Sequence, residues 1–146
     1  MYEVLDSIAD AVNPLTFIIV LGCIGYLAIK KDQRWLPSAL TLFTGAVITY
    51  GFMFLDNSFG LWPKMGLDYS THTAVAVVLA VTLFKSLSVK WWPVVTLAYV
   101  VLMLIQKYHT VGDIVVTGIV AGGFAYLFAV FFNALLVSPP LESDLV

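Results

Sequence analysis

The chain has 146 residues, of which 61 % are hydrophobic and 11 % are charged, and its formal net charge is -2. A soluble domain of this size cannot bury so much apolar surface, so the composition excludes an ordinary globular protein and makes the lipid bilayer the expected solvent. The small net charge and the lack of a basic patch argue against a nucleic-acid partner. The single cysteine, Cys23, excludes an internal disulfide and a cysteine-rich metal site.

The N-terminal residues are acidic where a cleavable signal peptide would be basic, so we expect no such signal. Leu5, Ile8 and Val12 recur at helical spacing, which predicts a short interfacial helix before the first membrane span. A frayed leader is the alternative for this segment. Pro14 suits the first turn of the helix that follows.

Five segments are apolar and about 17–25 residues long, which is the length that a transmembrane helix needs. They cover residues 11–29, 35–55, 69 or 70 to about 88, 91–106 and 113–137. The third and fourth are expected to be short or tilted, because their uncharged stretches are brief. Each span must satisfy its own backbone hydrogen bonds, and no alternating barrel pattern occurs. We therefore predict an all-α polytopic membrane helix bundle of about five transmembrane helices, forming one domain over residues 1–146.

Features at the span boundaries support this map and orient it. Trp35, Trp62, Trp91 and Trp92 lie at predicted boundaries, where tryptophan favours the membrane–water interface. The positive charges lie mainly in two loops on one side of the predicted topology, as follows: Lys30, Lys31, Arg34 and Lys90. The positive-inside rule then places the C-terminus in the cytoplasm and the N-terminus outside.

The two histidines, His72 and His109, fall at ends of apolar segments and on the outer side of this topology, which is periplasmic or lumenal. Ionisable groups near hydrocarbon are costly, so this cluster predicts a functional site. Asp113 follows His109 at i, i+4, so its carboxylate can accept a hydrogen bond from one imidazole nitrogen. That bond would fix the tautomer and raise the basicity of the other nitrogen. An imidazole held in this way is a nucleophile or a general base.

The sequence before His72 predicts an anion site. Ser70 or Thr71 is expected to cap the helix that contains His72, and free N–H groups at a helix start bind phosphate. Lys64 and Lys107 are the cations that the topology places on this side, and they flank the cluster in sequence. The predicted substrate-binding residues are Lys64, Lys107, Asp68, Tyr69, Ser70 and Thr71.

Two short motifs resemble those of a known family. Residues 108–115, Tyr-His-Thr-Val-Gly-Asp-Ile-Val, resemble the third signature of the type 2 phosphatidic acid phosphatase superfamily, a His-x3-Asp motif followed by an apolar helix. The stretch Ser70-Thr71-His72-Thr73 is similar to its second signature, Ser-Gly-His-Thr. The resemblance implies that His109 attacks phosphorus and becomes a phosphohistidine, that Asp113 orients it, and that His72 protonates the leaving group.

The resemblance covers about residues 68–122 and has clear departures. The first family signature, Lys-x6-Arg-Pro, is absent, and Met103 stands where the third signature has an arginine. Thr71 replaces the glycine of the second signature, and we expect about five spans where the family has about six. The sphingomyelin-synthase branch shares the two histidines and the aspartate without those arginines, so it is the more similar branch. Lysine would then supply the positive charge, as a point charge and not as a bidentate fork.

The resemblance implies an integral-membrane lipid phosphatase or phosphotransferase that acts on a phosphoester or pyrophosphate of a membrane lipid. The partners would be the bilayer and a lipid phosphate substrate, with no metal and no other cofactor.

Several alternatives stay open. The histidines are ordinary interfacial residues in one of them, and His109 with Asp113 is a structural pair at a helix start in another. Two histidines and one carboxylate also suit a metal ion. A non-catalytic assembly or regulatory protein, or a catalytically dead relative, is the main alternative function. A transporter is disfavoured because no span looks broken. Gly118 and Gly122 form a small-xxx-small pair, which predicts close helix packing.

Overall fold

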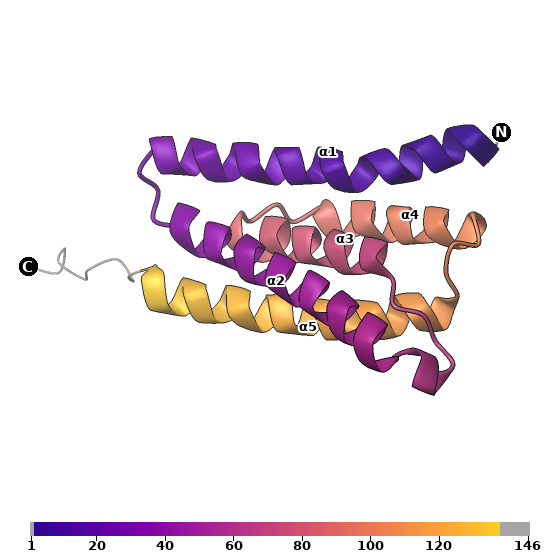
Figure 1. Ribbon diagram of the computed structural model, residues 1–146. Helices are drawn as coiled ribbons and strands as arrows, with labels where there is room; N and C mark the ends of the chain where they lie inside the picture. Colours follow the sequence, from indigo (N-terminus) through magenta and orange to yellow (C-terminus); the bar gives the residue numbers. More distant parts are fainter. Residues whose placement is uncertain (1, 138–146) are drawn as a thin grey trace, which may run out of the picture.

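The computed structural model describes residues 2–137, and the surroundings of side chains from residue 7 onward. Every regular element in this part of the chain is helical, which confirms the all-α prediction (Figure 1). In chain order these elements are α1 (Tyr2–Ile29), α2 (Trp35–Phe59), the 3-10 turn η1 (Pro63–Met65), α3 (Thr71–Val81), the π-helical turn η2 (Thr82–Ser86), α4 (Trp92–Ile105) and α5 (Val111–Leu136).

Three of the helices are long and apolar enough to cross a membrane, judged by length and composition: Ser7–Ile29 within α1, Trp35–Phe59 and Val111–Leu136. The other two are shorter. The 11 residues of α3 and the 5 of η2 extend about 24 Å, and the 14 of α4 about 21 Å, against a hydrocarbon core of about 30 Å. The prediction that these two are short is confirmed, whereas the count of five spans is not.

The N-terminal segment differs from the prediction. It belongs to α1, which is one 28-residue helix with Pro14 inside it, so the prediction of a separate interfacial helix is wrong. Pro14 is also not in the first turn. Figure 1 shows α1 changing direction in its N-terminal half. Proline inside a helix lacks the N–H that would bond to residue i−4 and bends the axis, so the helix continues with a bend.

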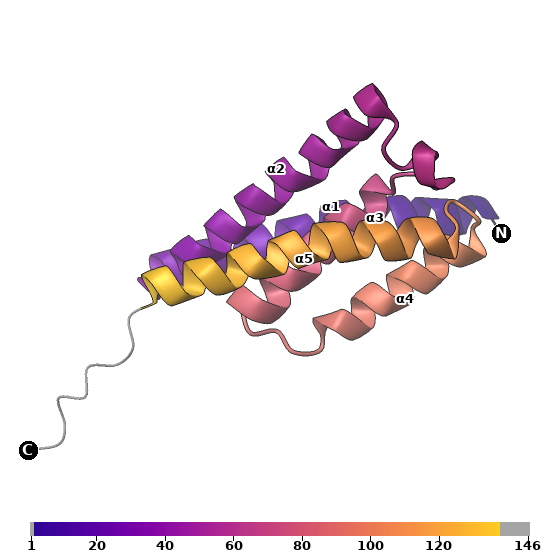
Figure 2. The ribbon, with the colours of Figure 1, turned by 90° about the horizontal axis from the view of Figure 1, so that it is seen from below.

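The helices run alternately up and down the bundle, so its loops gather at two ends (Figure 1). The histidine end holds the start of α1 and the loops at residues 60–70 and 106–110. The basic end holds the loops at residues 30–34 and 87–91. Figure 2 shows α2 diverging from α5 toward the histidine end, where η1 lies. The starts of α3 and α5 therefore lie at the same end.

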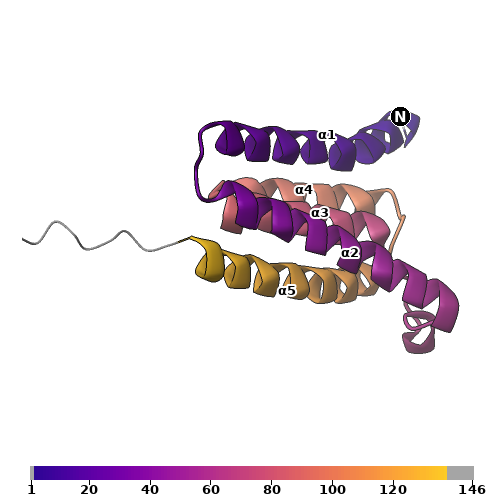
Figure 3. The same ribbon diagram turned by 60° about the vertical axis from the view of Figure 1, so that its left-hand side comes forward.

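Helix α3 occupies the centre of the bundle and contacts each of the other helices. Figure 3 shows α1 and α5 on opposite sides, with α3 and α4 between them. Two glycines bring α3 close to its neighbours: a Cβ on Gly45 of α2 would meet Val78, and a Cβ on Gly122 of α5 would lie 2.5 Å from Cγ1 of Val77. The predicted packing role of Gly122 is thereby confirmed, and α3 is fixed between α2 and α5.

The four tryptophans divide into two pairs. Trp35 and Trp91 are exposed, in agreement with an interfacial position, whereas Trp62 and Trp92 are buried inside the bundle. Trp62 packs edge-on against Tyr69 with ring centroids 4.8 Å apart, and Trp92 belongs to a core cluster with Leu79 and Leu83. An indole at a helix end can therefore serve as core, because the loop beside it folds back over the bundle.

Candidate functional site at the histidine end

The start of α3 is built by Ser70, which is the N-cap of the helix as predicted. Its side-chain oxygen accepts a hydrogen bond from the backbone N–H of Thr73 at 3.2 Å, and its own N–H donates to Oγ1 of Thr117 in α5 at 3.3 Å. Ser70 is fully buried. The cap thus fixes the first turn of α3 against α5, and it leaves His72 in that first turn at a defined position.

His72 has three neighbours that fix its surroundings. Its Nε2 lies 3.9 Å from Oδ1 of Asp10 in α1, and its ring stacks on Tyr108 with centroids 6.5 Å apart and planes 5° apart. Its backbone carbonyl accepts a hydrogen bond from Nδ2 of Asn13 at 3.1 Å. The side chain is 55 % exposed. His72 is therefore accessible, and it stacks on the residue next to His109.

A cavity of about 450 Å³ lies between α1, α2 and α3, and His72 is part of its wall. Asp10, Tyr50 and Thr71 line it near the histidine end, and Phe17, Ala46 and Val75 line it one or two helical turns deeper. Its wall is polar toward the loops and apolar toward the middle of the bundle.

The start of α5 is closed by Asp113. Its backbone N–H donates to Oγ1 of Thr110 at 3.2 Å, and its Oδ2 accepts from the Thr110 N–H at 2.7 Å, which is a capping box. Its Oδ1 accepts from the N–H of Asp68 at 2.8 Å. Asp113 is buried. One carboxylate therefore completes the capping box whose N-cap is Thr110, and it also holds the loop before α3.

His109 lies beside this carboxylate without a hydrogen bond to it. Its Nδ1 is 3.9 Å from Oδ2 of Asp113, beyond hydrogen-bond range, and this buried nitrogen has no hydrogen-bond partner. The side chain is 14 % exposed. Each carboxylate oxygen has two lone pairs, so Oδ2 can still accept an N–H from His109 if the ring moves about 1 Å closer.

The predicted substrate-binding residues have different positions. Lys64 and Lys107 are exposed, and Thr71 lines the cavity. Tyr69 is buried, and its hydroxyl donates to the backbone oxygen of Thr49 at 2.9 Å. Burial, with the carboxylate of Asp56 nearby, raises the pKa of Tyr69 to about 12, so it stays a neutral donor. Tyr69 and Ser70 are therefore engaged in holding the loop.

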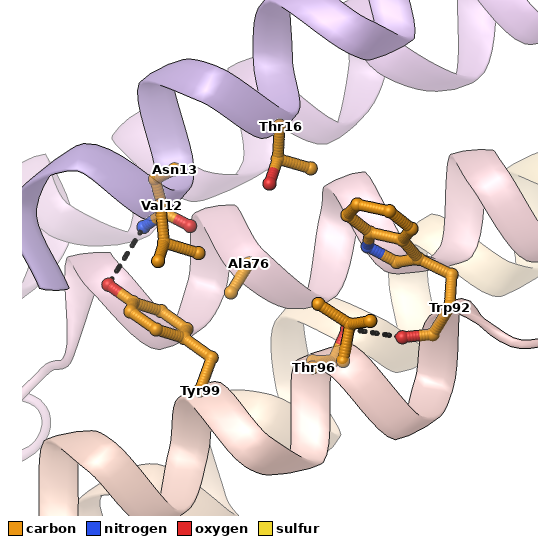
Figure 4. Close-up of a pocket in the computed structure, with 8 residues that line it drawn as sticks. Val12, Asn13, Thr16, Ala76, Trp92, Thr96 and Tyr99 are labelled. Atoms are coloured by element: carbon orange, nitrogen blue, oxygen red, sulfur yellow. Dashed lines mark hydrogen bonds between the residues drawn. The ribbon is translucent and has the colours of Figure 1, made fainter. Parts of the chain in front are cut away.

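Sequence reasoning missed the contribution of α1. Asp10 and Asn13 reach His72 from this helix, and Asn13 Nδ2 also lies 3.4 Å from the hydroxyl of Tyr99 in α4, which donates to the backbone oxygen of Ala9 at 3.3 Å. Figure 4 shows Asn13, Thr16 and Tyr99 around a small neighbouring cavity of about 10 Å³. The available signal was the three-residue spacing of Asp10, Asn13 and Thr16 in an otherwise apolar helix, which places them on one face.

The arrangement offers two imidazoles in unlike settings, an accessible one beside Asp10 and a mostly buried one beside Asp113. Among the residues that the structure describes, no three His, Cys, Asp or Glu side chains lie close enough together to hold a metal ion. These side chains can supply two kinds of chemistry themselves. His72 can transfer a proton, and His109 can act as a nucleophile or transfer a proton once its side chain is uncovered.

Comparison with protein-family models, with curated proteins and with solved structures finds no match for this chain.

Proposed function

We propose that this protein is an integral-membrane lipid phosphatase or phospho-headgroup transferase. The observation that carries the proposal is the position of both histidines at one end of the bundle, with Tyr108 stacked on His72 and preceding His109 directly. Three helices long and apolar enough to cross a bilayer supply the membrane setting. The motifs around His72 and His109, which resemble those of the type 2 phosphatidic acid phosphatase superfamily, supply the reaction class.

In the proposed reaction, Nε2 of His109, the imidazole nitrogen that is not next to Asp113, attacks the phosphorus of a lipid phosphoester or pyrophosphate. An N–P bond forms, the P–O bond to the leaving group breaks, and His72 gives its proton to the departing oxygen. Water or an alcohol then attacks the phosphohistidine, the N–P bond breaks, and His72 takes the proton of the attacking oxygen. Asp113 is a positioning residue that stabilises the charge on His109.

Two features of the histidine end define what the reaction requires. His109 must be uncovered before it can reach a substrate, because its side chain is 14 % exposed. Lys107, two residues before it, has a left-handed backbone with φ of 58°, so the α4–α5 loop turns sharply at this point. Lys64 and Lys107 would supply positive charge to the phosphate.

We place this end at the periplasmic or lumenal face, because the Lys/Arg loops gather at the other end.

The test is phosphate release from a panel of lipid phosphates in detergent micelles containing EDTA, with an alcohol acceptor added in parallel. We expect turnover by the wild type and a loss of about 100-fold or more in His109→Gln. Asp32→Asn, in the loop at the basic end, is the control and is expected to keep full activity. Turnover that survives His109→Gln would remove His109 from the mechanism.

A second candidate function is a non-catalytic membrane protein. The observation that favours it is the engagement of Asp113, since both carboxylate oxygens already accept backbone N–H groups and His109 is largely covered. In that case the His-x3-Asp motif supports the start of α5 and no phosphate is released. Absence of turnover with every substrate and acceptor, in a protein that is folded in the same detergent, would favour this candidate.

A further inference from the structure

The wall of the 450 Å³ cavity carries a negative charge. Asp10 is the carboxylate among the described residues that line it, and the other polar side chains of the wall, such as Tyr50, Thr71 and His72, are uncharged when the imidazole is neutral. Among the described residues of this lining there is no lysine or arginine. An anionic group such as a phosphate is therefore disfavoured here, and a hydrogen-bond donor with a positive charge is favoured.

The carboxylate of Asp10 is available to a ligand. Its side chain is 70 % exposed, and Nε2 of His72 lies 3.9 Å from its Oδ1, outside hydrogen-bond range. Tyr50 contributes an aromatic ring to the same wall and is 54 % exposed. A carboxylate and an aromatic ring are the two groups that recognise an ammonium ion, the first by charge and the second by a cation–π contact.

The deeper part of the cavity is apolar. Phe17 lines it two turns below Asp10, and Ala46 and Val75 line it one turn below the mouth. The same three residues also border a smaller cavity of about 70 Å³. That second space continues along Leu42, Val78 and Leu79 toward the middle of the bundle. The combined space therefore has a polar, negatively charged mouth and an apolar extension, which is the shape and polarity of an amphiphile.

We infer that the space between α1, α2 and α3 binds a long-chain amphiphile with an ammonium headgroup. The headgroup lies between Asp10 and Tyr50, and the hydrocarbon chain follows Phe17, Ala46 and Val75. This inference does not rest on the proposed phosphoryl chemistry, because binding requires neither histidine to react.

The experiment compares three amphiphiles with the same chain and different headgroups: dodecylamine, dodecanol and dodecyl phosphate. Each is titrated at about pH 8, where an alkylamine is charged, into the full-length protein in a nonionic detergent, and binding is measured by calorimetry against protein-free micelles. We expect the amine to bind about 10-fold more tightly than the alcohol, and the phosphate to bind most weakly. Equal affinity for amine and alcohol, or tightest binding of the phosphate, overturns the inference.

Two variants locate the site. Asp10→Asn keeps the size of the side chain and removes its charge, so the amine should lose its roughly 10-fold advantage while the alcohol binds as before. Ala46→Phe fills the apolar extension and should weaken the amine and the alcohol together. Asp32→Asn removes a carboxylate at the basic end and should change neither. An amine preference that survives Asp10→Asn contradicts the proposed headgroup site, and it does so even if Ala46→Phe fails to fold.

Discussion

The two flanks of α3 are packed in different ways. Toward α2 and α5, glycines let the backbones approach, with Gly45 under Val78 and Gly122 under Val77. Toward α1, the packing is looser and leaves the 450 Å³ cavity, which is also bordered by Ala46 and Tyr50 of α2. His109 and Asp113 lie on the tight flank at the start of α5, whereas His72 faces Asp10 of α1 on the loose flank.

The difference teaches that two similar sequence positions can have different physical roles. Both histidines lie next to the start of a helix, each with a carboxylate 3.9 Å away. His109 is mostly covered and its Nδ1 has no partner, while His72 on the loose flank is half-exposed. Packing density beside a residue, and not its motif, decides how far a ligand can reach it. Three substitutions test this contrast.

The largest effect is expected from Asp113→Ala. It removes the acceptor of two backbone N–H groups, those of Asp68 and Thr110, and thereby breaks the capping box at the start of α5, so we expect a loss of about 2–4 kcal/mol in the free energy of unfolding. The measurement is thermal unfolding in detergent, followed by tryptophan fluorescence. Asp68→Ala is the control, because Asp68 contributes its backbone N–H and its side chain is exposed. Equal losses in the two variants would contradict the role of the Asp113 carboxylate.

A smaller effect is expected from Gly122→Ala. The added Cβ would lie 2.5 Å from Cγ1 of Val77, a β-branched side chain with little rotamer freedom, so α3 and α5 must separate. We expect a loss of about 1–3 kcal/mol by the same measurement. The neighbouring glycine provides the control: nothing lies within 4 Å of a Cβ on Gly123, so Gly123→Ala should be neutral or slightly stabilising. If Gly122→Ala is as stable as its control, the flank is less tight than the contacts indicate.

The smallest effect is expected from Tyr99→Phe, on the α1 side. The change removes the hydroxyl that accepts from Asn13 and donates to the backbone oxygen of Ala9, and it leaves the ring in place. We expect a loss of about 0.5–1.5 kcal/mol. Tyr26→Phe, which removes the hydroxyl of an exposed ring, is the matched control and should change stability by less than about 0.5 kcal/mol. A Tyr99→Phe loss larger than that of Gly122→Ala would reverse the order of the two flanks.

Much of the helical frame could be predicted from the sequence. Apolar stretches between charged loops predict where α2 and α5 lie. The residue type of Ser70 predicts its role as a cap, because its side-chain oxygen can accept a hydrogen bond from a backbone N–H in the first turn of α3. The position of both histidines at one end also follows from counting alternating segments. These features depend on local sequence, which a single chain displays directly.

Three other features depend on packing between helices, which the sequence does not display: the extent of α1, the burial of two tryptophans and the contact of Asp10 with His72. Pro14 indicated a helix start, yet the structure continues α1 through it from Tyr2. Trp62 and Trp92 indicated membrane interfaces, yet both are buried by loops and neighbouring helices. Asp10 was read as one charge of an acidic N-terminus, and its approach to His72 is set by how α1 packs against α3. Tertiary contacts of this kind override local preference.

The hydrogen bond between the N–H of Asp68 and the carboxylate of Asp113 joins residues 45 positions apart in the chain. A ribosome adds about 5–20 residues per second, so the amide is made roughly 2–9 s before its acceptor. During that interval the loop before α3 lacks this bond, and the first turn of α3 is held by Ser70 and by the bond from Asn13 to the His72 carbonyl. Synthesis therefore completes the histidine end late, when the first turn of α5 arrives beside a helix that is already in place.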